Sequence, residues 1–121
     1  MCSSDLPSVE GHGGKIRSYD FKSEKGIIRA LVFLGRTHLY EGKGIEPVVH
    51  GVRTAVKAGC RSIVLTNACG GINREYSVGQ PVLIRDHISL TGVSPLIGAT
   101  FVDLTDCYSK RLRALVKAED P

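Results

Sequence analysis

Tryptophan is absent from this chain of 121 residues, and its aromatic side chains are three phenylalanines and four tyrosines. Without aromatic residues interleaved among basic ones, there is no platform on which nucleic-acid bases could stack. The formal net charge is +4, yet no run of lysine and arginine is longer than two residues. A mildly positive field of this kind favours a small anion such as phosphate over nucleic acid.

Long apolar runs and paired cysteines are also missing. No stretch approaches the roughly 18 apolar residues of a membrane-spanning helix, and the first residues lack the apolar segment of a signal peptide. The four cysteines show neither C-x-x-C nor Cys/His ligand spacing, which indicates neither a zinc site nor a redox pair. Reduced, well-separated thiols fit a cytoplasmic protein.

The pattern of apolar and turn residues predicts an α/β fold. We expect strands at 15–21, 27–35, 62–65 and 81–84, and helices at 47–58 and 106–117. The first two strands should pair through a polar turn, and the first helix should end at Gly59. A helix that leads into a buried strand favours a central, mostly parallel or mixed β-sheet flanked by helices. The 42% hydrophobic content is enough to bury a core.

Residues 35–42 (GRTHLYEG) are the most informative segment. If the segment is extended, Arg36, His38 and Tyr40 point the same way, because side chains alternate between the faces of a strand. A guanidinium and an imidazole together suit an oxyanion such as phosphate, and a tyrosine hydroxyl suits a sugar. A plain solvated strand would carry the same row, so this segment alone leaves both interpretations open.

Two glycine-containing segments add to this pattern. Residues 61–66 (RSIVLT) run directly into residues 67–71 (NACGG), and ligands of open α/β sheets bind at the carboxyl ends of strands. The glycines allow successive N–H groups to turn toward an anion. Neither Lys-Ser nor Lys-Thr follows, so the turn is not the nucleotide-triphosphate P-loop. Residues 11–14 (GHGG) place a histidine between glycines.

Together these motifs resemble the trimeric, low-molecular-mass class of purine nucleoside phosphorylases. The resemblance covers residues 7–121 and rests on five blocks in order: GHGGK (11–15), GRTHLYEG (35–42), VLTNACGGIN (64–73), VGQPVLIRDHISL (78–90) and SPLIGATFVDLTDCYS (94–109). It implies the nucleoside phosphorylase fold, incomplete here because the family's subunit is more than twice as long. Residues 1–6 match no part of the pattern and resemble a translated sequencing adapter. We therefore expect an artefactual leader there and a partial domain over 7–121.

The resemblance implies reversible phosphorolysis of purine (deoxy)ribonucleosides, with inosine and guanosine favoured, to free base and (deoxy)ribose 1-phosphate. Inorganic phosphate would be a co-substrate, and no metal or other cofactor is implied. Catalysis would then consist of positioning and electrostatic stabilisation. The class also implies a cytoplasmic homotrimer.

The resemblance also implies a role for each matching residue. Arg36 and His38 would be catalytic and would bind phosphate, together with His12 and the backbone N–H of Ala68. Tyr40 would contact the ribose, and Phe101 would close the sugar pocket of a neighbouring subunit. One wall of the purine site would be formed by Ala68, Cys69 and Gly70. Glu41 would orient His38 only if the segment bends near Tyr40, and otherwise it would be structural.

Simpler roles compete with several of these assignments. His12 could cap a loop, Tyr40 could be a packed core tyrosine, and Cys69 fits a small buried thiol better than a nucleophile. His50 is expected on a helix surface and His87 in a strand, each without a functional role. Asp86 is expected to be a structural ion-pair partner.

Three other functions remain open at this point. Methylthioadenosine phosphorylase shares the phosphate chemistry, and a non-catalytic phosphate- or nucleoside-binding half-domain would share the motifs. A redox-active thiol protein is disfavoured, because no resolving cysteine lies near Cys69. The family's Gly-Ser phosphate loop, and the Glu and Asn that recognise the purine, are expected outside these residues. We therefore expect weak phosphate binding and no measurable catalysis from this chain alone, with its base preference undetermined.

Overall fold

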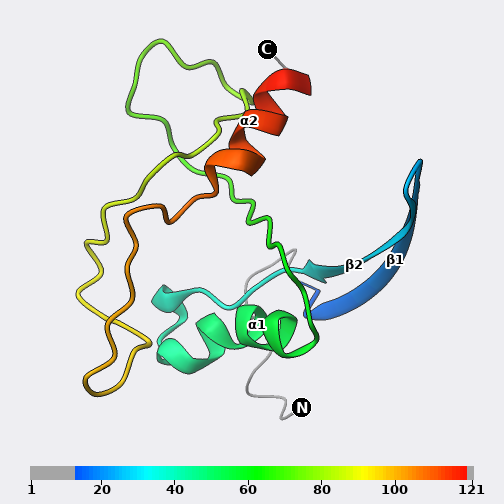
Figure 1. Cartoon of the computed structure of the whole chain (residues 1–121). Helices are drawn as coiled ribbons and strands as arrows, with labels where there is room; N and C mark the ends of the chain where they lie inside the picture. The colour runs from blue at the N-terminus through cyan, green and yellow to red at the C-terminus, as the bar shows by residue number, and fades with distance from the viewer. Residues whose placement is uncertain (1–12, 120–121) are drawn as a thin grey trace. The chain divides into compact units, whose positions relative to one another are not determined.

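The computed structural model describes residues 13–119 and divides into two units, Met1–Leu65 and Thr66–Pro121, each of which is described by itself (Figure 1). The first unit contains strands β1 (Lys15–Ser23) and β2 (Gly26–Leu34), the short 3-10 helix η2 (Leu39–Glu41) and helix α1 (Ile45–Lys57). The second unit contains helix α2 (Lys110–Glu119), preceded by a long irregular segment.

Strands β1 and β2 form the antiparallel hairpin that the sequence predicts. Their register pairs Lys15 with Leu34 at one end and Ser23 with Gly26 at the other, so the reversal is only two residues long. Gly26 adopts φ +115°, a conformation that a residue with a Cβ rarely takes. The hydroxyl of Ser23 donates to the Gly26 carbonyl at 2.8 Å and so closes the turn.

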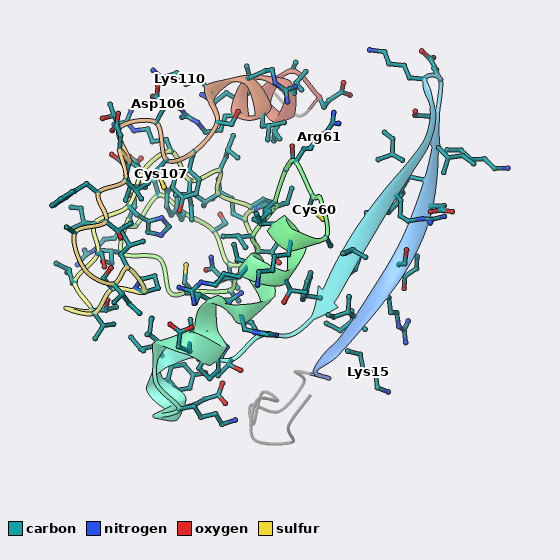
Figure 2. The ribbon with its side chains drawn as sticks, turned by 60° about the horizontal axis from the view of Figure 1, so that its bottom comes forward. Lys15, Cys60, Arg61, Asp106, Cys107 and Lys110 are labelled. Atoms are coloured by element: carbon teal, nitrogen blue, oxygen red, sulfur yellow. The ribbon has the colours of Figure 1, made fainter. Side chains whose placement is uncertain are left out.

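The C-terminal end of β2 lies close to α1. A Cβ placed on Gly51 of α1 would lie 3.5 Å from the ring of Phe33 in β2, so helix and strand are in close contact there. β2 is accordingly half-buried over residues 30–34, whereas β1 is exposed along its whole length. Figure 2 shows side chains projecting from the hairpin into open space.

Helix α1 matches the predicted helix at 47–58, although it begins two residues earlier. It ends through two backbone bonds typical of a Schellman motif: Gly59 N–H to the Val56 carbonyl and Cys60 N–H to the Ala55 carbonyl, both at 3.0 Å. Gly59 makes this geometry possible with φ +87°. Of the predicted apolar stripe, Ala55 is buried, Val48 and Val49 are half-buried, and Val52 and Val56 are exposed.

The predicted strands at 62–65 and 81–84 are wrong, because both segments lack regular structure. Val64 is 84% exposed and Leu65 is 68% exposed, so neither is buried as expected. A strand satisfies its N–H and C=O groups only through a neighbouring strand. In the described part of the chain, β1 and β2 pair with each other, and the sheet is two-stranded and antiparallel rather than mostly parallel.

The expected core is also much smaller than the composition suggests. Within residues 13–119, Ala55 is the one buried hydrophobic residue and Thr37 the one buried polar residue. Apolar side chains are buried only where a second layer covers them, and α1 covers only part of β2. The hydrophobic content therefore remains largely at the surface of these two units.

Helix α2 begins four residues later than predicted. The Ser109 hydroxyl accepts from the N–H of Leu112 at 3.3 Å, which makes Ser109 the cap. The predicted first residue, Asp106, lies before the helix and forms an ion pair with Lys110 at 2.8 Å (Figure 2). Of the side chains expected to face inward, Tyr108 and Leu112 are half-buried, whereas Leu115 and Val116 are exposed.

No helix within residues 13–119 is long and apolar enough to cross a bilayer.

Candidate functional site

The central motif, residues 35–42, forms a turn rather than the extended row that the sequence suggested. β2 ends at Leu34, and Gly35 takes φ +104°, which interrupts the two-residue alternation of the strand. His38 is still extended (φ −98°, ψ 149°), but residues 39–41 then form η2. The prediction that all three side chains share a strand face is therefore wrong, because a 3-10 turn has a period of three.

The turn nevertheless brings His38 and Tyr40 together. Their rings are stacked, with centroids 4.8 Å apart and planes inclined by 14°. Tyr40 is 75% exposed, so it is not the packed core tyrosine considered above. Arg36 is exposed, and Thr37 between Arg36 and His38 is 4% exposed and anchors the segment. The result is an exposed arginine and an aromatic stack at the edge of the first unit.

The side chain of Glu41 stabilises the turn through a hydrogen bond and an ion pair. Its Oε1 accepts the backbone N–H of His38 at 2.6 Å, and its own N–H donates to the His38 carbonyl at 3.1 Å. Its Oε2 lies 3.1 Å from the ammonium of Lys43, and its side chain is only 4% exposed. The expected bend near Tyr40 is confirmed. Because of this bend, Glu41 hydrogen-bonds to the backbone of His38 and orients it. The sequence signal for this arrangement was an acidic residue three positions after a helix cap.

The other residues implied for the site give a different result. His12 lies outside the described residues. Ala68, Cys69, Gly70 and Phe101 belong to the second unit and are all exposed, Phe101 to 93%. Cys69 is thus not the small buried thiol that we expected. Neither Gly70 nor Gly71 has a positive φ, so the glycine pair forms no left-handed turn that would direct N–H groups at an anion.

The structure pairs two further polar aromatic side chains, Tyr108 and His87, which the sequence did not predict to be in contact. The Tyr108 hydroxyl and Nδ1 of His87 are hydrogen-bonded, with ring centroids 5.4 Å apart. His87 lies in an irregular segment, not in a strand, and its N–H donates to Asp86 Oδ1 at 2.8 Å. Partial burial raises the pKa of Tyr108, and the nearby Cys107 and Asp86 raise it further. His50, by contrast, is exposed on α1 as predicted.

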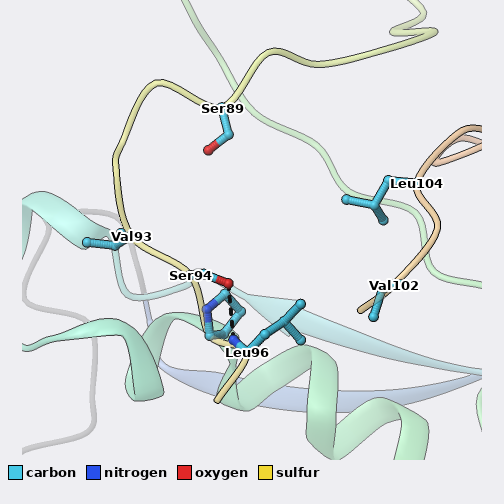
Figure 3. A pocket seen from close by; sticks show the side chains of 7 residues that line it. Ser89, Val93, Ser94, Leu96, Val102 and Leu104 are labelled. Atoms are coloured by element: carbon cyan, nitrogen blue, oxygen red, sulfur yellow. Dashed lines mark hydrogen bonds between the residues drawn. The ribbon is translucent and has the colours of Figure 1, made fainter. Parts of the chain in front are cut away.

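The second unit also contains an apolar pocket of about 450 Å³ (Figure 3). It is lined by Ser89, Val93, Ser94, Pro95, Leu96, Val102 and Leu104. The Ser94 hydroxyl accepts the N–H of Leu96 at 3.2 Å. Apart from the two serine hydroxyls the lining is apolar and contains no titratable side chain, so this pocket offers mainly apolar contact.

Among residues 13–119, no three His, Cys, Asp or Glu side chains come together as a cation would require. Cys60, Cys69 and Cys107 are all free thiols.

Comparison with known proteins decides the family. The profile described as the phosphorylase superfamily matches residues 5–120. The chain belongs to this superfamily. A relative called purine nucleoside phosphorylase from Cellulomonas sp is 56% identical over 116 residues. Relatives of the same name from Mycobacterium tuberculosis and Rattus norvegicus are 51% and 34% identical, over 115 and 116 residues respectively.

These relatives are considerably longer than the chain. The matches cover 95% of this chain but 41% of the Cellulomonas and Mycobacterium tuberculosis proteins, and 88% against 39% for the rat protein. The chain thus spans about two-fifths of the curated relatives that it matches. The superfamily membership supports an α/β architecture, of which these residues contribute the β1–β2 hairpin and two helices.

Proposed function

We propose that this chain supplies the phosphate- and ribose-binding part of a purine nucleoside phosphorylase. The observation that carries the proposal is the His38–Tyr40 stack on a turn fixed by Glu41, two residues after the exposed Arg36. The names of the relatives support the same activity. The reaction is the cleavage of a purine (deoxy)ribonucleoside by inorganic phosphate, which gives the free base and (deoxy)ribose 1-phosphate.

The side chains of the turn suit this chemistry. The planar guanidinium of Arg36 matches two phosphate oxygens, and the imidazole of His38 offers a further donor. Tyr40 is exposed and stacked on that imidazole, and its hydroxyl suits a ribose hydroxyl. As a phosphate oxygen forms the bond to the anomeric carbon, the glycosidic bond breaks and its electron pair leaves with the purine. Positioning and electrostatics suffice, so phosphate is the co-substrate and no cofactor takes part.

The remaining roles complete the proposed enzyme. The resemblance of the sequence motifs also assigns His12 and the backbone N–H of Ala68 to phosphate, and residues 68–70 to a wall of the purine site. Phe101, whose ring is 93% exposed, is suited to enter the sugar pocket of a neighbouring subunit in a homotrimer. In the full-length protein, a central, mostly parallel or mixed sheet would complete the fold. Inosine and guanosine are the expected substrates, in cytoplasmic purine salvage.

A chimera tests this proposal. Residues 7–120 of this chain replace the matching segment of the Cellulomonas relative, and phosphate-dependent release of hypoxanthine from inosine is measured. Activity is expected, with a loss of at least about a hundredfold in Arg36→Gln, the size typical for one donor to a developing charge. Lys22→Gln, on exposed β1, is the matched control and should retain activity. A folded trimer that releases no hypoxanthine would instead favour the non-catalytic half-domain.

A further inference from the structure

The geometry points to Lys43 as a positioning residue for His38, acting through Glu41. Its ammonium lies 3.1 Å from Glu41 Oε2, while Glu41 Oε1 holds the backbone N–H of His38 at 2.6 Å. The inference deepens the proposed function, because His38 is there a phosphate ligand. Lys43 is not assigned to the phosphate itself.

The backbone explains how a lysine two residues from Glu41 reaches it. Side chains at positions i and i+2 do not face each other on a helix. Here, however, Gly42 and Gly44 on either side of Lys43 take φ +72° and +79°. Gly42, between Glu41 and Lys43, is left-handed (ψ 11°) and turns the chain so that Lys43 comes back onto the end of η2, whereas Gly44 follows Lys43 and has ψ −177°. Their Cβ positions would meet nothing within 4 Å, so backbone conformation rather than crowding accounts for the glycines.

Burial makes this ion pair different from an ordinary surface pair. The Glu41 side chain is 4% exposed and that of Lys43 is 27% exposed, whereas the pairs Asp20–Arg29 and Asp106–Lys110 are 45% or more exposed on both sides. A carboxylate withdrawn from water needs compensating charge and hydrogen bonds. The Lys43 ammonium supplies charge on one oxygen, and the His38 N–H satisfies the other.

The Lys43–Glu41 ion pair affects the position of the His38 imidazole through the backbone of His38. The Glu41 carboxylate and the Glu41 N–H together hold both the N–H and the carbonyl of His38. With its backbone fixed on both sides, the His38 ring remains stacked on Tyr40 at 4.8 Å. Without Lys43, the carboxylate would be drawn toward water, the cap would open more often, and the ring would leave the stack for part of the time.

Amide hydrogen exchange of His38, followed by NMR in this chain, tests the inference directly. Lys43→Met should speed the exchange of the His38 N–H about three- to tenfold, the range expected for one partly buried ion pair. The ring-current shifts of the His38 and Tyr40 side chains should shrink in parallel. Lys43→Arg should restore both signals, and Lys57→Met on the exposed end of α1 should change neither.

A double substitution separates this route from a general loss of structure. In a Glu41→Gln background, Lys43→Met should have no further effect on the His38 amide, because its path runs through the carboxylate. An equal effect of Lys43→Met with and without Glu41 would overturn the inference, as would unchanged exchange in Lys43→Met. None of these readouts needs phosphate or turnover. They can therefore succeed while the proposed function fails, or the reverse.

Discussion

The imidazole of His38 lies almost parallel to the phenol ring of Tyr40, with 4.8 Å between the ring centroids. Both rings belong to one tight turn, and the buried carboxylate of Glu41 fixes its first residue. The side chains proposed to bind phosphate and ribose are thus held at a fixed separation by local chain geometry.

Tyr40→Leu should abolish the upfield ring-current shift of the His38 imidazole protons, whereas Tyr40→Phe should retain it, because the phenyl ring preserves the stack. An aromatic pair contributes about 0.5–1.5 kcal/mol beyond buried area, and the exposure of Tyr40 places this pair at the lower end. Side-chain NMR of the two variants measures the shift. Equal shifts in both variants would contradict the stacked arrangement.

Two glycine-to-alanine substitutions should have opposite effects on stability. Gly42→Ala should destabilise the first unit by about 1 kcal/mol, since φ +72° disfavours any Cβ. Gly51→Ala should stabilise it by about 0.5–1 kcal/mol, because alanine favours the helix and its Cβ would make an ordinary 3.5 Å contact with Phe33. Urea unfolding followed by circular dichroism measures both. Destabilisation by Gly51→Ala would show that α1 packs closer to β2 than described.

The carboxylate of Asp20 should titrate below its ordinary range. Two hydrogen bonds from Arg29, at 2.7 and 2.9 Å, and the positive charge of Arg29 lower the pKa of Asp20. A lowered pKa means that the pair's contribution is complete above the pKa of an unfolded aspartate and is lost as the pH falls through the folded value. In a carboxyl NMR titration, Arg29→Gln should raise the midpoint of Asp20 toward that of an unfolded aspartate. An unchanged midpoint would show that the pair does not persist in solution.

Tyr108 should ionise at higher pH than a free tyrosine. Partial burial raises the pKa of its hydroxyl first, and the charges of Cys107 and Asp86 raise it further. Because the folded pKa is raised, the stability gained from the neutral phenol is present at lower pH and is lost as the pH rises through that value. In Cys107→Ser and Asp86→Asn the tyrosine should ionise at lower pH than in the unaltered chain, as followed by ultraviolet difference absorbance. A rise in either variant would contradict the assigned cause.

The sequence predicts those parts of the fold that depend on neighbouring residues. The β1–β2 hairpin follows from two apolar runs around a polar turn, and the end of α1 follows from Gly59. Segments whose structure depends on distant partners were predicted wrongly. Residues 62–65 have the composition of a buried strand, but they have no paired strand in the described part of the chain, and Val64 is 84% exposed.

In the candidate site, too, some features were predictable from the sequence and others were not. The residue types in GRTHLYEG predict the kind of ligand, but their alternation wrongly predicts a strand, because Gly35 and η2 change the period. The role of Glu41 could have been recognised from its position three residues after His38. The contact of Lys43 with Glu41 could not have been recognised, since it depends on the left-handed backbone of Gly42.

Phosphate titration of the isotope-labelled chain, followed by backbone and side-chain NMR, tests the central claim most directly. We expect saturable shifts at Arg36 and His38, with a dissociation constant in the millimolar range or weaker. The shifts should disappear in Arg36→Gln and should exceed those caused by chloride at equal ionic strength. Shifts no larger than those from chloride, or confined to residues far from this turn, would contradict the assignment of the turn as the phosphate site.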